Sequence, residues 1–222
     1  MKAMILAAGR GERMGKLTQN CPKPLLKVKG RCLIDWHLIK LCEAGFKDVV
    51  INVAYLSKEI IEFVGDGSKW GLNISISEEE QALETAGGIK KAMKYLGDEA
   101  FAVINADIFS DYNYENLKAR SLQNNIMGHL VLVNNPEHNL KGDFGIMDNG
   151  ILTMNFERSL TFSGIAIYDP KFFSELAEGN KIKLAPILEI AINKKCIQGE
   201  LFEGLWSDVG TPERLNMINL NE

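Results

Sequence analysis

The amino-acid sequence predicts an α/β fold, in which a mixed, mainly parallel β-sheet is flanked by helices. Two observations support this prediction. Short apolar runs of strand length alternate with segments of helical period along most of the 222 residues. Such alternation is typical of βαβ units with right-handed crossovers. No repeat, linker or low-complexity tract interrupts the pattern, and we therefore expect a single domain over residues 1–222.

The first half of the chain contains four predicted strands and three predicted helices. The strands are expected at 2–8, 48–54, 72–78 and 100–107, because these runs are short and apolar or alternate cleanly. The helices are expected at 33–44, 58–64 and 85–95, where apolar residues recur at helical spacing. Gly45 follows the first helix, in the position where glycine commonly ends one. Residues 1 to about 110 therefore predict a half with the type of fold that is common in nucleotide-binding proteins.

In the second half, from about 111 to 222, strands and helices alternate less regularly. Strands are expected at 129–135, 160–168 and 197–205, and a helix is expected at 184–193. Asn149-Gly150 lies between two apolar runs and predicts a hairpin turn. This half therefore predicts antiparallel additions to the sheet and a second wall for a binding site.

The composition excludes several functional classes. The net charge is −4, with 25 basic and 29 acidic residues, which disfavours binding to nucleic acid or to an anionic membrane. No apolar run approaches the roughly 20 residues needed to span a bilayer. The four cysteines have no metal-ligand spacing, and the N-terminus does not have the pattern of a secretory signal. We therefore expect a cytoplasmic protein with small-molecule ligands.

A glycine-rich loop follows the first predicted strand. Gly9 and Gly11 permit a positive φ angle and allow backbone N–H groups to approach a ligand closely. Four cations lie in or near this loop, namely Arg10, Arg13, Lys16 and Lys23. Amide groups and cations together suit a polyphosphate, because both favour dispersed negative charge.

Lys23 stands between two prolines, which fix the backbone on either side of it. Such rigidity predicts a functional lysine, since a solvated surface lysine gains nothing from it. The loop matches neither of two common phosphate-binding patterns. It has no Walker motif, and Met14 stands where a dinucleotide fingerprint needs glycine or alanine.

The segment LAAGRGERMGKLTQNCPKPLL, at residues 6–26, resembles the signature of the sugar nucleotidyltransferases. These enzymes make nucleoside diphosphate sugars from a nucleoside triphosphate and a sugar 1-phosphate. The resemblance continues through ETAGGI, INADIF, DFG, LTFSGI, KLAPIL and WSDVGTPERL, and so covers nearly the whole chain. Lys16 departs from the proline that many members have, and Ala86 departs from a common glycine. The resemblance implies a Rossmann-like sheet.

The resemblance also implies a nucleotide-binding site at the N-terminal loop. The implied nucleotide-binding residues are Leu6, Ala8, Gly9, Gly11, Glu12, Arg13, Lys23, Thr85 and Gly88. The backbone of residues 6–9 would hold the nucleoside, and Gly11, Arg13 and Lys23 would bind the triphosphate. Residues 85–88 would line the base and ribose pocket. Arg13, Lys23 and Asp107 are the implied catalytic residues.

For the sugar phosphate and the metal, the resemblance implies residues from both halves. Asn105, Asp143, Glu157 and Lys183 are the implied substrate-binding residues, although FERS lacks the Glu-Lys-Pro pattern of many relatives. Asp107 and Asp208 would bind Mg²⁺. Independently of the family, ligands of open α/β sheets bind at the carboxyl ends of the strands, where Asp107 is expected. Carboxylates and phosphates are also the usual ligands of Mg²⁺.

Within the family, KGDFG, LTFSGI and KLAPIL are similar to segments of short uridylyltransferases that act on N-acetylmuramic acid 1-phosphate. The implied substrates are UTP and that sugar phosphate. The alternatives are glucose, mannose or N-acetylglucosamine 1-phosphate with UTP, dTTP or GTP, or a non-catalytic nucleotide sensor. We expect a monomer or a small homo-oligomer without an appended acyltransferase domain.

Several polar residues are expected to be structural rather than functional. We expect His37 to be a partly exposed residue of its helix, and no arrangement of serine or cysteine supports a catalytic triad with it. We also expect the acidic run 78–80 to be a solvated strand end.

Overall fold

The computed structural model describes residues 1–155 and 159–220, and its centre is a seven-stranded sheet. The strand order is β12-β8-β11-β6-β1-β4-β5, and only β11 runs antiparallel to its neighbours. The strands are β1 (Ala3–Leu6), β4 (Asp48–Val53), β5 (Asn73–Glu78), β6 (Phe101–Asn105), β8 (Gly128–Val133), β11 (Thr161–Tyr168) and β12 (Ile197–Phe202). The predicted fold, a mixed and mainly parallel sheet, is confirmed.

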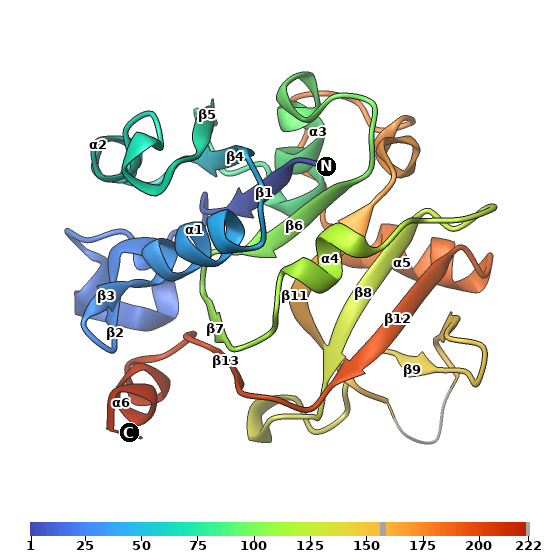
Figure 1. The fold of residues 1–222 in the computed structure, drawn as a ribbon. Helices are drawn as coiled ribbons and strands as arrows, with labels where there is room; N and C mark the ends of the chain where they lie inside the picture. The colour runs from blue at the N-terminus through green and yellow to red at the C-terminus, as the bar shows by residue number, and fades with distance from the viewer. Residues whose placement is uncertain (156–158, 221–222) are drawn as a thin grey trace.

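Helices cover both faces of this sheet (Figure 1). One face packs against α1 (Leu33–Glu43), α2 (Ser57–Val64) and α4 (Glu115–Ala119), and the other against α3 (Glu84–Leu96) and α5 (Leu184–Asn193). Strand β1 shows the reason, because successive side chains of a strand point to opposite faces. Ile5 packs in the cluster that contains Ile34 and Leu38 of α1, while Met4 packs in the cluster that contains Ile89 of α3.

Three two-stranded sheets extend this framework. They pair β2 (Lys27–Val28) with β3 (Arg31–Cys32), β9 (Gly145–Ile146) with β10 (Leu152–Thr153), and β7 (Ile108–Ser110) with β13 (Trp206–Asp208). The hairpin predicted at Asn149-Gly150 is confirmed by the antiparallel β9–β10 pair. Within the described residues, 3₁₀ helices span Glu12–Thr18, Lys23–Leu25, Ser68–Trp70, Glu137–Asn139 and Pro170–Phe173.

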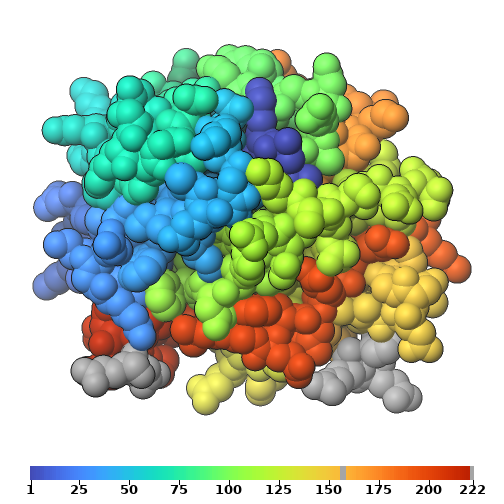
Figure 2. All heavy atoms as spheres, in the orientation of Figure 1, coloured from blue at the N-terminus to red at the C-terminus, as the bar shows by residue number. Residues whose placement is uncertain are grey.

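The C-terminal segment returns to the start of the chain. Helix α6 (Pro212–Leu220) places Leu215 and Ile218 in a small apolar cluster with Met14, Leu26 and Leu33. Figure 2 shows this red segment running along the lower edge of the molecule to the blue N-terminal region. The packing therefore brings the segment that contains Asp208 beside the loop that follows β1.

The structure corrects two expectations about the fold. The predicted strand 100–107 ends at Asn105, so that Asp107 lies in the turn between β6 and β7. His37 is buried rather than partly exposed, because its Nδ1 lies 2.8 Å from the Tyr114 hydroxyl inside the core. Among the described residues, no helix is long and apolar enough to cross a membrane.

Candidate active site

A cavity of about 520 Å³ opens where β1, β4 and β6 end, at the carboxyl edge of the sheet. Most of the sequence-predicted site residues line it, namely Leu6, Ala8, Gly9, Gly11, Glu12, Arg13, Lys23, Thr85, Asn105 and Asp107. The fold therefore gathers residues that lie up to about a hundred positions apart in the sequence.

The glycine-rich loop forms one wall of this cavity. Gly11 has a φ angle of 65°, a left-handed conformation that glycine adopts without strain. A Cβ atom at this position would lie 3.1 Å from the Thr18 methyl group and 3.2 Å from Lys23 Cβ. The Gly11 carbonyl accepts hydrogen bonds from Met14 N and Thr18 Oγ1, so that the loop is fixed before any ligand arrives.

Lys23 comes from the short 3₁₀ helix Lys23–Leu25, which Pro22 and Pro24 hold in place. Its residue is only 7% exposed, yet the side chain lines the cavity. Its Nζ donates to Asp107 Oδ2. The rigid lysine predicted from the flanking prolines therefore stands at the centre of the site, next to the carboxylate expected to bind metal.

A buried polar chain supports the floor of the cavity. Asn52 Oδ1 accepts a hydrogen bond from Ala7 N, and Asn52 Nδ2 donates to Glu79 Oε1 at 2.8 Å. Glu79 Oε2 in turn accepts from Leu83 N, at the start of α3. Glu79 is only 3% exposed, so the expectation of a solvated acidic run at 78–80 is wrong for this residue.

Gly88 belongs to this support rather than to the cavity lining. A Cβ atom on Gly88 would lie 2.7 Å from Glu79 Oε1 and 2.8 Å from Asn52 Nδ2. The residue is buried in α3. Glycine is therefore needed at this position to leave room for the Asn52–Glu79 pair, and the cavity wall is formed instead by Ala82, Glu84 and Thr85.

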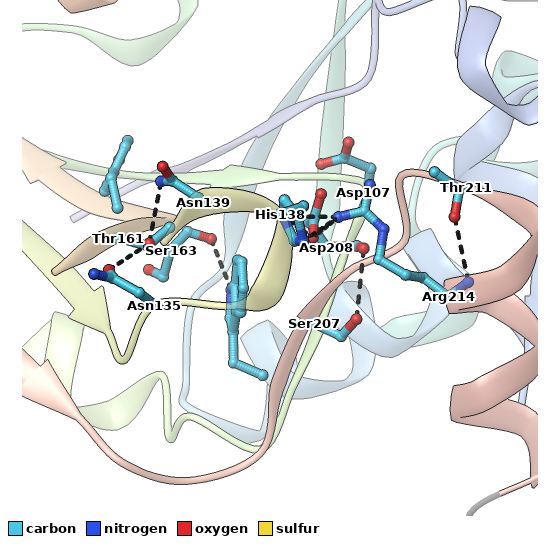
Figure 3. Close-up of polar contacts among 12 residues, drawn as sticks. Asp107, Asn135, His138, Asn139, Thr161, Ser163, Ser207, Asp208, Thr211 and Arg214 are labelled. Atoms are coloured by element: carbon cyan, nitrogen blue, oxygen red, sulfur yellow. Dashed lines mark hydrogen bonds and ion pairs between the residues drawn. The ribbon is translucent and has the colours of Figure 1, made fainter. Parts of the chain in front are cut away.

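Asp107 and Asp208 lie on neighbouring segments. Strand β13 pairs with β7 so that Asp208 is opposite Ile108, and Val209 N donates to the Asp107 carbonyl at 2.7 Å. Asp208 Oδ1 accepts from Arg214 Nη1 of α6 and lies 3.1 Å from His138 Nε2. Figure 3 shows His138 and Arg214 converging on Asp208 from two elements.

These two carboxylates suit a hard divalent cation. Each has one oxygen held by a basic side chain, and the other oxygen has no hydrogen-bond partner among the described residues. Within residues 1–155 and 159–220, no group of three or more histidine, cysteine or acidic residues could hold a metal by itself. Mg²⁺ is commonly bound by one or two carboxylates and completed by substrate phosphates, and the residues present fit that arrangement.

Asn105 is the last residue of β6 and lines the cavity, and β11 is the antiparallel neighbour of β6. The register of β11 against β8 shifts between Phe162 and Ile165, and Gly164 in this bulge has a φ angle of 81°. A Cβ atom on Gly164 would lie 2.6 Å from Asn105 Nδ2. The bulge and the glycine together make the space that the Asn105 amide occupies.

The remaining predicted substrate residues lie apart from the cavity lining. Asp143 is exposed and accepts hydrogen bonds from Phe162 N and Asn139 Nδ2. Lys183 is exposed immediately before α5. Glu157 lies outside the described residues. The part of the chain that the structure describes therefore brings Asn105, but neither Asp143 nor Lys183, to the cavity.

Burial beneath the site perturbs one histidine strongly. His37 lies near the backbone of Ala106 and Ile108, on either side of Asp107, and burial is the main cause that lowers its pKa to about 4. The nearby Lys40 ammonium acts in the same direction. His37 is therefore neutral at physiological pH and acts as a packing residue under the turn that holds Asp107.

Sequence reasoning missed several residues of this region. Asn52 could have been recognised, because a buried strand seldom carries an asparagine without a hydrogen-bonding role. Glu84, Gly210, His138 and Arg214 gave no comparable signal, since their positions depend on contacts between distant segments.

The sheet and the cavity define the class of the protein: an α/β protein with a cavity at the carboxyl ends of its strands, which is where open sheets of this kind bind their ligands. A family model described as nucleotidyl transferase matches residues 2–222. The chain belongs to the nucleotidyl transferase family.

Individual relatives differ in how much of their length the chain covers. The chain is 47% identical to N-acetylmuramate alpha-1-phosphate uridylyltransferase of Neisseria meningitidis, over 97% of this chain and 95% of that relative. It is 28% identical to mannose-1-phosphate guanyltransferase of Gibberella zeae, over 96% of this chain and 62% of the relative. For UTP–glucose-1-phosphate uridylyltransferase of Synechocystis, the identity is 29% over 83% of this chain and 53% of the relative. The chain thus spans somewhat over half of these two longer relatives.

Solved structures share the fold at lower sequence identity. A Bacillus anthracis protein described as a candidate glucose-1-phosphate thymidylyltransferase, in complex with a sucrose, has a TM-score of 0.85 and 21% identity, over 99% of this chain and 94% of that chain. HddC of Yersinia pseudotuberculosis has a TM-score of 0.79 and 20% identity, over 98% and 97% respectively. These similarities establish the fold.

Proposed function

We propose that this protein transfers the uridylyl group of UTP to N-acetylmuramic acid 1-phosphate, giving UDP-N-acetylmuramic acid and pyrophosphate. The observation that carries this proposal is the 47% identity to the Neisseria uridylyltransferase over nearly the full length of both chains. The longer guanyltransferase and glucose-1-phosphate relatives are less than 30% identical. Because nucleoside triphosphates are cytoplasmic metabolites, we place the reaction in the cytoplasm.

We assign nucleotide binding to the half formed by residues 1 to about 110, and sugar phosphate binding to the half from about 111 to 222. The loop from Gly9 to Arg13 supports the first assignment, since its wall of the cavity carries backbone amides and cations. Asn105 lies where β6 meets β11, so it stands between the two halves. An amide there can donate to the attacking phosphate or to a sugar hydroxyl.

In the proposed reaction, a phosphate oxygen of the sugar 1-phosphate attacks the α-phosphorus of UTP in line. A bond from this oxygen to the α-phosphorus forms, and the bond to the bridging oxygen of pyrophosphate breaks. The nucleophile is already an anion, so the reaction requires no general base. Arg13 and Lys23 stabilise the charge that develops on the α-phosphate and on the leaving pyrophosphate.

Asp107 and Asp208 are the residues that would hold Mg²⁺, each through its free carboxylate oxygen. The bound ion supplies Lewis-acid stabilisation of phosphate charge. Lys23 and Arg214 meanwhile fix the orientation of the two carboxylates, because each donates to one oxygen of its partner. Both carboxylates are therefore held in a fixed orientation before the substrates bind.

The test is a matrix of four nucleoside triphosphates against four sugar 1-phosphates, with pyrophosphate release as the measurement. The sugar phosphates are those of N-acetylmuramic acid, N-acetylglucosamine, glucose and mannose. The proposal predicts the highest kcat/KM for UTP with the muramic acid compound. A higher value for another pair would contradict the substrate assignment, and release with none of the pairs would contradict the enzyme assignment.

A further inference from the structure

Arg214 lies beside the cavity, although it belongs to the C-terminal helix. Its side chain extends from α6 toward Asp208 and His138 (Figure 3), and its Nη1 donates to Asp208 Oδ1. Nη1 also lies 2.8 Å from His138 Nε2, so that two groups hold the guanidinium in one orientation. The side chain is only 12% exposed. Arg214 is therefore a mostly buried and oriented cation next to a carboxylate expected to hold Mg²⁺.

Gly210 allows this guanidinium to reach the wall of the cavity. Among the residues that the structure describes, Gly210 is the only one from 111–222 that lines the cavity. Its φ angle lies outside the left-handed region, so the backbone conformation does not require glycine. A Cβ atom at this position would lie 2.2 Å from Arg214 Nη2, and it would displace the guanidinium. Glycine therefore leaves the space in which Nη2 packs against the cavity wall.

Part of the guanidinium is free to bind a ligand. A guanidinium has five N–H donors on three nitrogen atoms. Within the described residues, only Nη1 of Arg214 makes hydrogen bonds, to Asp208 and His138. Nη2 is not among the fully enclosed polar atoms that lack a partner. This nitrogen therefore has no partner in the described part of the chain, yet it remains accessible beside Gly210.

The charges around Arg214 favour an anionic ligand from the second half of the site. Asp208 carries one negative charge, which cannot neutralise both the guanidinium and a divalent cation on its other oxygen. Arg13 and Lys23 lie on the wall that we assign to the triphosphate. The planar guanidinium fork matches the oxygens of a phosphate group. A second phosphate that enters from the side of residues 111–222 would therefore meet an oriented donor beside Asp208.

We propose that Arg214 is a further substrate-binding residue, whose Nη2 donates to the phosphate of the sugar 1-phosphate. This inference rests on the proposed function and names a protein group that holds the attacking phosphate. One oxygen of that phosphate attacks the α-phosphorus of UTP, and Arg214 holds another of its oxygens. Arg214 thus orients Asp208 through Nη1 and the acceptor through Nη2.

The experiment measures by calorimetry the affinity for N-acetylmuramic acid 1-phosphate of the protein loaded with Mg²⁺ and the α,β-imido analogue of UTP, in which the bond that would break is blocked. Arg214→Gln keeps an N–H donor for Asp208 but removes the charge, so this affinity should fall by about tenfold or more. The affinity for Mn²⁺ should not fall, because a neighbouring positive charge has been removed. Arg214→Lys keeps the charge and should lose less. Lys141→Gln removes an exposed cation of the second half outside the cavity lining, and this matched control should bind like the wild type.

An unchanged affinity for the sugar phosphate in Arg214→Gln would overturn the inference, as would equal losses in Arg214→Gln and Arg214→Lys. Parallel losses of Mn²⁺ and sugar phosphate affinity would also overturn it, because Arg214 would then act only through Asp208.

N-acetylglucosamine 1-phosphate identifies the anionic group that Arg214 binds, because it carries the phosphate without the lactyl carboxylate. Its affinity should fall in Arg214→Gln by a similar factor. A loss confined to the muramic acid compound would overturn the inference, since Arg214 would then bind the carboxylate. If the folded wild type binds neither sugar phosphate, the proposed function fails instead, so the two failures can be told apart.

Discussion

Substitution of Lys23 tests whether this lysine stabilises the charge on the substrate phosphates. The lysine is 7% exposed, is held between two prolines and donates to Asp107. A unit charge about 4 Å from a phosphate oxygen contributes about 4 kcal/mol at an effective dielectric constant of 20. Lys23→Ala removes that charge, and we expect kcat to fall by roughly 10²–10³-fold, as for the loss of a preorganised donor.

The matched control is Lys16→Ala, which removes an exposed lysine of the same loop that does not line the cavity. Pyrophosphate release under saturating substrates should give nearly wild-type kcat for this variant. Circular dichroism and a melting curve establish that both variants are folded. Equal losses in the two variants, or a folded Lys23→Ala protein with more than a tenth of wild-type kcat, would refute the assigned role of Lys23.

Two further predictions concern the metal carboxylates and the histidine beneath them. Asp107→Asn and Asp208→Asn should each lower kcat by about 10²–10³-fold and weaken Mn²⁺ binding, measured by electron paramagnetic resonance; a folded variant with wild-type values would exclude its aspartate from the metal site. The pKa of His37 is about 4 in the folded protein, against 6.5 for an exposed histidine. Between pH 6.5 and pH 4, the unfolded chain therefore binds a proton that the folded chain does not. The free energy of unfolding falls as the pH is lowered through this range. Between pH 7 and pH 5 the loss is about 2 kcal/mol, and denaturant titration of the metal-free protein should show a smaller loss in His37→Gln. An equal loss in wild type and variant would show that other groups cause the pH dependence.

Much of the fold could be predicted because its strands and helices carry strong local patterns. The helix at 184–193 was predicted with the bounds that the structure shows for α5, since its apolar residues repeat at helical spacing. Buried strands β1 and β4 were predicted within two residues of their ends. The place of β11 in the sheet could not be predicted, because its antiparallel pairing with both β6 and β8 is set by contacts between distant segments.

The site was predictable where one segment carries several of its residues. The loop from Gly9 to Lys23 combines glycines, cations and prolines within a short stretch, and residues 9–13 together with Lys23 line the cavity. His37 and Glu79 were misjudged, because a polar residue in an apolar pattern does not reveal its partner. Their partners, Tyr114 and Asn52, lie 77 and 27 positions away.

In the proposed function, the chain selects N-acetylmuramic acid 1-phosphate as the acceptor of the uridylyl group. The most direct measurement is a competition in one vessel, with UTP, Mg²⁺ and equal amounts of N-acetylmuramic acid 1-phosphate and N-acetylglucosamine 1-phosphate, and with both UDP-sugars quantified by mass spectrometry. The two sugars differ only in the lactyl ether and its carboxylate, and a site built for that group should reject the sugar that lacks it. We predict that UDP-N-acetylmuramic acid forms in at least about tenfold excess. Equal amounts of the two products, or an excess of UDP-N-acetylglucosamine, would contradict selection of N-acetylmuramic acid 1-phosphate.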